Sequence, residues 1–178
     1  MATQTIDMPT AKLDMDNVPT MLDDALRATA AKSSRSPKET LEAMRSGDCA
    51  TCDAVRYRLA ETLAEYLAMV DHGVKAVYLY EPEYATGADS AVTERPSLSP
   101  GISMIVWSDR KSAALSAVVA SLNARLAEEA EHLTCPKANA LCWTLDAQIV
   151  DDQQVQSNSG YGALINSLYV RPLELWHR

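Results

Sequence analysis

Three short, strongly apolar segments limit what this chain can fold into. Residues 74–80 are apolar at nearly every position, residues 102–107 repeat that pattern, and residues 143–150 alternate apolar with polar side chains. Continuous apolar segments are typical of strands covered on both faces, and alternation is typical of a strand with one polar face. Longer segments with helical spacing separate them. The pattern predicts an α+β domain with a mixed β-sheet of about four strands and packed helices.

The helices are expected before and between these strands. Residues 48–71 carry the clearest pattern, with apolar side chains every three or four positions: Val55, Leu59, Leu63, Leu67 and Val70. A second helix is expected from Asp109 or Ser112 to about Leu133. Ser36-Pro37-Lys38-Glu39 predicts another helix start, because Ser36 caps, Pro37 fits the first turn and Glu39 closes a capping box.

The two ends of the chain have weaker patterns. Thr20 is a weak N-cap signal before a short apolar face. Residues 157–160 resemble a turn, residues 161–168 a helix, and residues 169–176 a final strand with Pro172 marking an edge. We expect a flexible arm at residues 1–18, a helical extension at 19–47, and a single α+β domain at 48–178.

Charge and hydropathy narrow the class of protein. The net charge of −8 argues against a general nucleic-acid binder, because phosphate backbones require clustered Lys and Arg. The sequence has no apolar stretch near the roughly 18 residues that span a bilayer, so no membrane association is expected. The first residues lack the basic start and apolar run of a signal peptide. The expected location is therefore the cytoplasm, where structural disulfides are rare.

The order of elements and the strand sequences VYLYEPEY, PGISMIVWSD and TLDAQIVDD resemble the nucleotidyltransferase superfamily, the fold of DNA polymerase beta. The resemblance covers roughly residues 59–176. It implies a Gly-Ser pair after the first strand, an Asp-x-Asp on the next and a further acid on a third. Three such carboxylates hold two divalent cations for catalysis.

The chain departs from that pattern at the positions that carry the chemistry. Glu81-Pro82 stands at the Gly-Ser position, and Pro82 has no amide hydrogen to donate to a phosphate. Gly101-Ile102-Ser103 stands at the Asp-x-Asp position. Only Asp146 remains, where the third acid belongs, and a solvated acid on a polar strand face is the simpler explanation for it. The resemblance therefore implies a fold without its usual catalysis.

The resulting hypothesis is a non-catalytic nucleotidyltransferase-like domain that acts by binding a protein partner or a small ligand. The candidate ligand-binding residues are Tyr80, Glu81, Tyr84, Ser103 and Asp146. Tyrosine side chains suit a recognition surface because they pack and hydrogen-bond together. Core packing explains Tyr78 at least as well. Self-association as a homodimer through an exposed strand edge is also possible.

The cysteines give an alternative function. Cys49-Ala50-Thr51-Cys52 lies at an expected helix N-terminus, where amide dipoles favour a thiolate, so a thiol-redox site is one interpretation. Zinc is another, because Cys135 and Cys142 could complete a four-thiolate set with this pair. The spacing between Cys135 and Cys142 is loose for such a site. Simple burial of the cysteines as small apolar residues stays open as well.

Overall fold

The computed structural model describes residues 18–80, 101–133, 143–169 and 171–178, with side chains omitted at 130–133. The elements follow the order α1 (Val18–Lys32), α2 (Pro37–Arg45), α3 (Cys49–Val70), β1 (Val74–Leu79), β2 (Ile102–Ser108), α4 (Ala113–Leu133), β3 (Leu145–Val150), α5 (Asp152–Gln156), α6 (Gly162–Ile165) and β4 (Leu173–His177). The predicted α+β class with a four-stranded mixed sheet is confirmed.

The four strands form one sheet in the order β3-β2-β1-β4. β1 lies in the centre and is antiparallel to both β2 and β4, whereas β2 and β3 are parallel. The pairing of β2 with β3 is regular over six residue pairs, from Ile102 opposite Leu145 to Trp107 opposite Val150. The pairing of β1 with β4 shifts register between Val77 and Tyr78. The two outer strands therefore differ in regularity.

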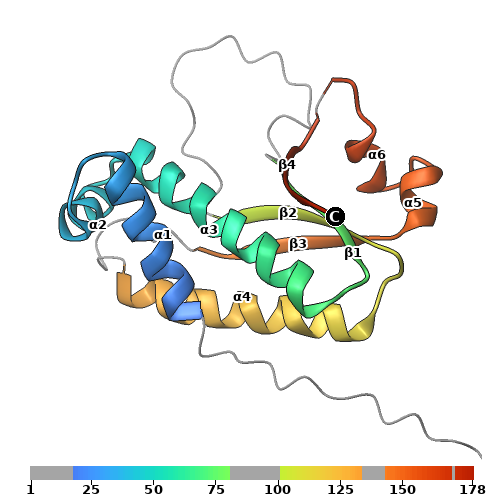
Figure 1. Cartoon of the computed structure of the whole chain (residues 1–178), viewed down its shortest axis with the longest axis horizontal. Helices are drawn as coiled ribbons and strands as arrows, with labels where there is room; N and C mark the ends of the chain where they lie inside the picture. Colours follow the sequence, from blue (N-terminus) through green and yellow to red (C-terminus); the bar gives the residue numbers. More distant parts are fainter. Residues whose placement is uncertain (1–17, 81–100, 134–142, 170) are drawn as a thin grey trace, which may run out of the picture.

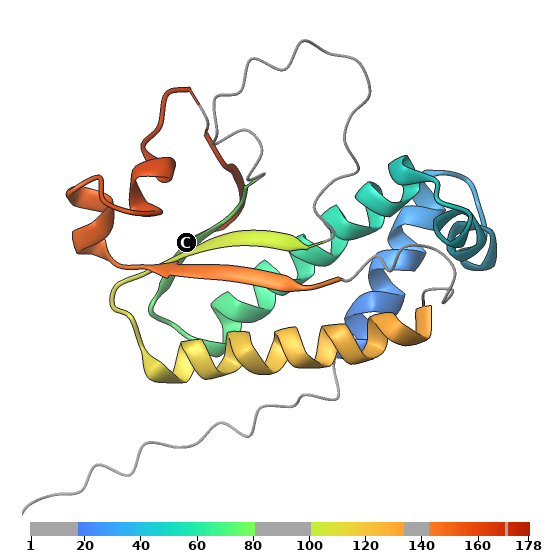
Figure 2. The same cartoon turned by 180° about the vertical axis from the view of Figure 1, so that it is seen from behind.

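Helices cover one face of the sheet, where the larger core lies (Figures 1 and 2). The predicted apolar stripe of α3 points into this core, and Leu59, Leu63 and Leu67 are fully buried. α4 contributes Leu115, Val118, Leu122 and Leu126, which recur every three or four residues along the helix expected up to about Leu133. α1 also joins this core, with Val18, Met21, Leu22, Ala25 and Leu26 all buried. Residues 19–47 thus begin with a helix that packs on the same core as the sheet.

α5 and α6 pack against the opposite face of the sheet (Figure 2). A smaller core forms there from residues of β1, β2 and β3 with Val155 and Ile165. Lys75 on β1 binds both carboxylate oxygens of Asp152 at 2.6 and 2.7 Å, and the Trp107 indole N–H donates to the same carboxylate at 2.8 Å. These contacts fix the first residue of α5 to the sheet. β1 is covered on both faces, as its apolar sequence predicts.

The helix caps agree with the sequence at three of the four expected starts. Ser36 and Glu39 form the predicted capping box of α2, and the Ser112 hydroxyl accepts the Leu115 N–H at 2.9 Å at the start of α4. Asp48 caps α3 through Thr51. The predicted cap at Thr20 is wrong, because α1 already begins at Val18.

The C-terminal third holds the main corrections. The expected helix over residues 161–168 is reduced to the four residues of α6, and α5 precedes it where no helix is predicted. The Asp151 carboxylate caps α5 by accepting the Gln154 N–H at 2.9 Å. The final strand starts at Leu173 rather than at residue 169, and Tyr169 is almost fully exposed.

Candidate functional site

Three of the five predicted ligand-binding residues come together on the face of the sheet opposite α3 and α4. Ser103 and Asp146 lie directly opposite each other on β2 and β3, and the Tyr80 N–H donates to the Ser103 carbonyl at 3.0 Å. Ser103 and Tyr80 are buried, whereas Asp146 is exposed and accepts a hydrogen bond from Gln148 Nε2 at 2.7 Å. Glu81 and Tyr84 lie outside the described residues.

The electrostatics of this cluster keep Tyr80 protonated. Burial raises the pKa of Tyr80, and a hydrogen bond with the Tyr161 hydroxyl and the charge of Asp146 raise it further, against a smaller opposing effect of a Ser103 hydrogen bond. The two tyrosine rings lie 5.7 Å apart at a tilt of 57°. Tyr80 therefore acts as a hydrogen-bond donor rather than as a general base. Tyr78 is buried in the smaller core, which agrees with the core-packing interpretation.

The first cysteine pair sits where the sequence places it, at the N-terminus of α3. Cys49 is exposed and Cys52 is buried. Burial raises the pKa of the Cys52 thiol to about 11, and the charges of Cys49 and of nearby carboxylates act in the same direction. Cys135 and Cys142 lie outside the described residues. Within the described part of the chain, no three His, Cys, Asp or Glu side chains are grouped so as to hold a metal ion.

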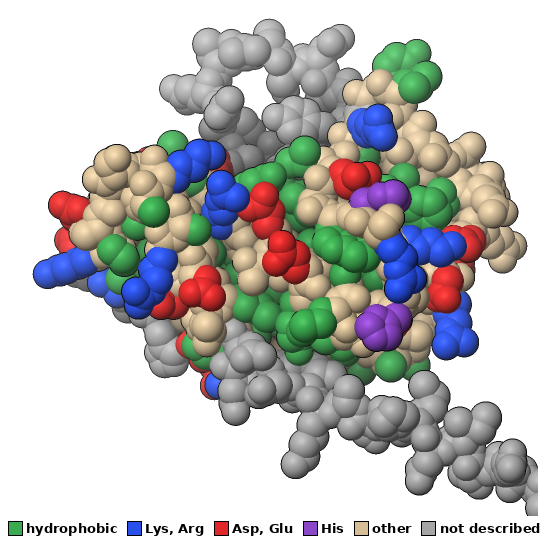
Figure 3. All heavy atoms as spheres, in the orientation of Figure 1, with side chains coloured by type: hydrophobic (Ala, Val, Ile, Leu, Met, Phe, Trp, Pro, Cys, Tyr) green, Lys and Arg blue, Asp and Glu red, His purple; other side chains and the backbone are tan. Residues whose placement is uncertain are grey.

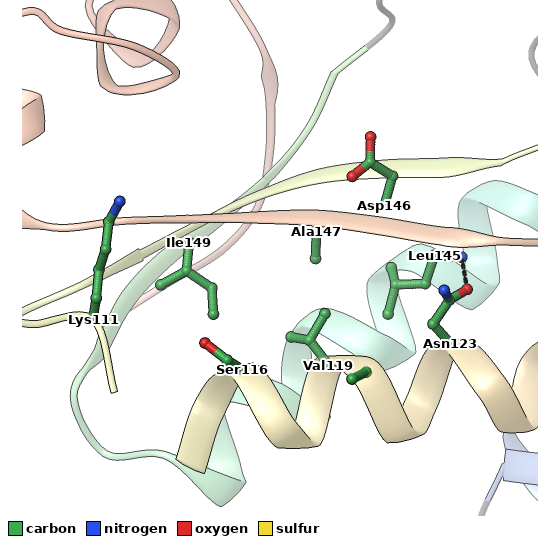
Figure 4. A pocket seen from close by; sticks show the side chains of 9 residues that line it. Lys111, Ser116, Val119, Asn123, Leu145, Asp146, Ala147 and Ile149 are labelled. Carbon is green, nitrogen blue, oxygen red and sulfur yellow. Dashed lines mark hydrogen bonds between the residues drawn. The ribbon is translucent and has the colours of Figure 1, made fainter. Parts of the chain in front are cut away.

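The sequence-based candidates omit a groove between α4 and the outer strand β3 (Figure 4). The groove has a volume of about 390 Å³ and is open to solvent on one side. Figure 4 shows an apolar floor where Leu145, Ala147 and Ile149 point toward α4, with Lys111 at the Ile149 end and Asn123 at the Leu145 end. The full lining is Lys111, Ser116, Val119, Ala120, Asn123, Leu145, Asp146, Ala147 and Ile149.

Hydrogen bonds at the start of β3 show which way its backbone faces. The Thr144 carbonyl accepts the Ile102 N–H at 2.7 Å, so Thr144 faces β2. The Leu145 N–H instead donates to Asn123 Oδ1 on α4 at 2.8 Å. Because the N–H and C=O of successive strand residues point to opposite sides, those of Ala147 and Ile149 point away from β2 and toward the groove. Within the described part of the chain, the outer edge of β3 therefore presents two residues, Ala147 and Ile149, whose N–H and C=O groups both face away from the sheet.

The other outer strand is protected in ways that β3 is not. Pro172 precedes β4 and a register shift interrupts the pairing of β4 with β1, whereas both outer strands carry one acidic residue, Glu174 on β4 and Asp146 on β3. Proline, bulges and charges are the usual means by which natural proteins block strand addition at an edge. β3 has no proline and no irregularity over its pairing with β2. Among the described residues, β3 is therefore the more regular of the two sheet edges.

The surface of α4 beside the groove lacks charge. The exposed positions between residues 113 and 124 hold only alanine and serine: Ala113, Ala114, Ser116, Ala117, Ala120 and Ala124. Solvent-facing helix surfaces ordinarily carry charged and polar side chains. By contrast, the face formed by α1 and α3 shows acidic and basic groups interspersed (Figure 3). The uncharged helix face is a signal present in the sequence that could have directed attention to this side of the molecule.

Comparisons with known proteins do not assign this site. No described helix has the length and apolar character needed to cross a membrane. No protein family model, no curated protein and no solved structure matches the chain.

Proposed function

We propose that the protein is a non-catalytic interaction module that binds an extended polypeptide segment by strand addition to β3. The observation that carries the proposal is the bond from the Leu145 N–H to Asn123, which shows that alternate backbone groups of β3 face the groove. Strand addition uses such groups for affinity and the adjoining side-chain pockets for specificity. The bound segment pairs with the outward-facing N–H and C=O groups of Ala147 and Ile149.

The groove defines the chemistry of that segment. The floor of Val119, Leu145, Ala147 and Ile149 accepts small or medium apolar side chains at every second position, because alternate side chains of an added strand face α4. The single cation at the rim, Lys111, favours an acidic group at the Ile149 end. The chemistry of the partner is therefore an extended apolar segment with one carboxylate at that end.

A proline substitution tests the proposal. Because the Ala147 N–H points into the groove, Ala147→Pro removes a donor for an added strand but leaves the bonds between β2 and β3 intact. Gln148→Pro is the matched control, because the Gln148 N–H faces β2 and removing this donor disrupts the pairing of β2 with β3. On an array of heptapeptides that alternate apolar and polar residues, the wild type should select a subset, and Ala147→Pro should bind those peptides at least about tenfold more weakly, which corresponds to about 1.4 kcal/mol.

Two controls make the peptide experiment decisive. Circular dichroism and the Tm should be retained in Ala147→Pro and lowered in Gln148→Pro. Equal binding of the selected peptides by wild type and a folded Ala147→Pro would overturn the proposal, as would the absence of any selected peptide for a wild type that is monomeric under the same conditions.

The non-catalytic part of the proposal has its own support and test. In the nucleotidyltransferase pattern that the sequence resembles, the Asp-x-Asp positions correspond to Gly101 and Ser103, and neither has a carboxylate. The remaining acid, Asp146, lies opposite Ser103 and accepts a hydrogen bond from Gln148. We therefore expect titration calorimetry with ATP or GTP to give no magnesium-dependent heat of binding. Tight binding that requires magnesium, and that Asp146→Asn abolishes, would show that a nucleotide site exists here after all.

A further inference from the structure

We propose that the strand added to β3 is β3 of a second copy, so that two chains form a symmetric dimer with one continuous eight-stranded sheet. This inference rests on the proposed function and names its partner. A two-fold axis perpendicular to the sheet places the two β3 strands antiparallel and keeps the helices of both copies on the same side. In the joined sheet, Leu145, Ala147 and Ile149 of both copies continue a single apolar layer on the face that α4 covers.

The available backbone groups fix the register of this pairing. A two-fold centred on Asp146 or on Ala147 requires the Leu145 N–H, which Asn123 already occupies. A two-fold centred on Gln148 pairs Ala147 of each copy with Ile149 of the other. Both N–H and both C=O groups of this pair face outward, so each copy gives and receives a complete set of bonds. A two-fold centred on Ile149 also spares Asn123, but it sets Ala147 opposite Asp151, which lies beyond the strand and caps α5, so the Gln148 register is the one that uses the outward groups of both Ala147 and Ile149.

The side chains at the axis agree with that register. A residue on a two-fold meets its own copy, so its side chain must be self-complementary. The Gln148 amide both donates and accepts, and it already donates to Asp146 in its own strand. Two Asp146 carboxylates at the axis would repel each other. In the Gln148 register, Asp146 of each copy lies opposite Val150 of the other and the two carboxylates stay apart.

The uncharged face of α4 lies where the second copy requires it. Asn123 is level with Leu145, and Gln148 lies about 10 Å further along β3. Because α4 runs antiparallel to β3, this distance corresponds to about seven helical residues and reaches Ser116 and Ala117. The axis therefore places Ala113 of one copy opposite Ala120 of the other.

Small side chains at those positions let the helices approach closely. Adjacent strands lie about 4.8 Å apart and packed helices about 8–10 Å apart, so in the dimer each α4 must lie slightly toward β2 of its own copy and the two helices must meet at the short end of that range. Alanine and serine at every exposed position from 113 to 124 permit that distance. A chain of net charge −8 repels its own copy over most of its surface, so an uncharged face is where two copies can meet.

Light scattering after size exclusion tests the dimer at about 50 μM chain, a concentration well above the micromolar Kd of a modest interface. We expect the mass of two chains for wild type and of one chain for both Ala147→Pro and Ala117→Glu. Ala28→Glu, which adds the same charge to an exposed position of α1, should remain dimeric. Circular dichroism should confirm that all variants are folded.

A cysteine placed on the axis tests the register. Residues that face each other in a non-hydrogen-bonded antiparallel pair have Cα atoms about 4.5 Å apart, within the range that a disulfide spans. Under oxidised glutathione, Gln148→Cys should form a disulfide between residues 148 of two chains, identified by mass spectrometry, and Asp146→Cys should not crosslink to its own copy.

The outcomes separate this inference from the proposed function. A monomeric wild type whose peptide binding is lost in Ala147→Pro overturns the dimer and leaves the interaction module standing. A monomer without such binding overturns both. A dimer that persists in folded Ala147→Pro, or that crosslinks at residue 146 rather than 148, overturns the dimer interface proposed here.

Discussion

At the scale of single residues, the two thiols of the Cys49–Cys52 motif differ in their exposure to solvent. Both lie in the first turn of α3, yet Cys49 faces solvent and Cys52 packs in the core, where burial raises its pKa to about 11. The helix N-terminus favours thiolates, but for Cys52 the loss of solvation is the larger effect. The motif therefore provides one accessible thiol rather than a matched reactive pair.

Alkylation measures this difference directly. With iodoacetamide at pH 8, Cys49 should be modified first, and Cys52 should react only when denaturant is added, because its thiol is both buried and protonated. Tandem mass spectrometry of the peptide that contains both residues distinguishes the two products. Equal rates would contradict the assignment. The zinc alternative expects something else, namely slow labelling of both thiols together with one zinc per chain by elemental analysis.

Residue-level chemistry of the cluster at Tyr80 was partly predictable. Alternation in β3 places Asp146 on the face opposite Leu145, and the apolar pattern of β2 leaves Ser103 as its polar exception. That these two residues lie opposite each other depends on strand order, which a hydrophobic pattern does not specify. Tyr161 is the N-cap residue of α6, and the position of this helix follows from the burial of Ile165 in the smaller core and not from its short sequence.

At the scale of elements, long periodic segments were predictable and short ones were not. α3 and α4 have enough turns for their apolar stripes to be unmistakable. α5 has five residues with one buried apolar side chain, Val155, so no periodicity reveals it. Its stability comes from the Asp151 cap and from the bonds that Lys75 and Trp107 make to Asp152. Such tertiary anchors are invisible in a sequence read one element at a time.

The anchor of α5 gives a pH-dependent prediction. Hydrogen bonds from Lys75 and Trp107 lower the pKa of Asp152, so this carboxylate stabilises the fold above its ordinary pKa of about 3.9 and loses that effect as the pH falls through the lowered value. Asp152→Asn should reduce the Tm modestly at pH 7, because both side chains are more than a third exposed. The difference from wild type should shrink by pH 3.

Thermal unfolding followed by circular dichroism at pH 7, 5 and 3 measures this effect. Asp24→Asn removes an exposed carboxylate from α1 and should behave like wild type at each pH. A deficit for Asp152→Asn that is as large at pH 3 as at pH 7 would show that the cause lies in packing and not in the charge.

At the scale of the whole molecule, the first helix packs on the larger core of the described residues. Leu22 and Leu26 of α1 share a core with α3, α4 and the sheet. The sequence marks α1 as amphipathic but cannot say which surface covers its apolar face. If α1 did not pack on this core, buried side chains such as Leu22, which is only 4% exposed, would face water.

Hydrogen exchange tests whether α1 and this core unfold as a unit. In low concentrations of denaturant, the slowest amides of α1 should exchange with the same free energy of opening as those of α3, because removing α1 exposes the shared core. Mass spectrometry of exchanged peptides gives both values in one experiment. Amides of α1 that open at a clearly lower free energy would favour the separate extension expected for residues 19–47.

The central place of β1 has a consequence for how the chain is made. One neighbour, β2, comes next among the strands, but the other is β4, so Val77 meets Trp176 about a hundred residues later in the chain. During synthesis on the ribosome, β1 must wait with one edge unsatisfied until β4 has emerged. In the finished protein that edge is hidden. The most vulnerable strand of the nascent chain is thus the one that ends up best protected, and a delay in translation before β4 prolongs its exposure.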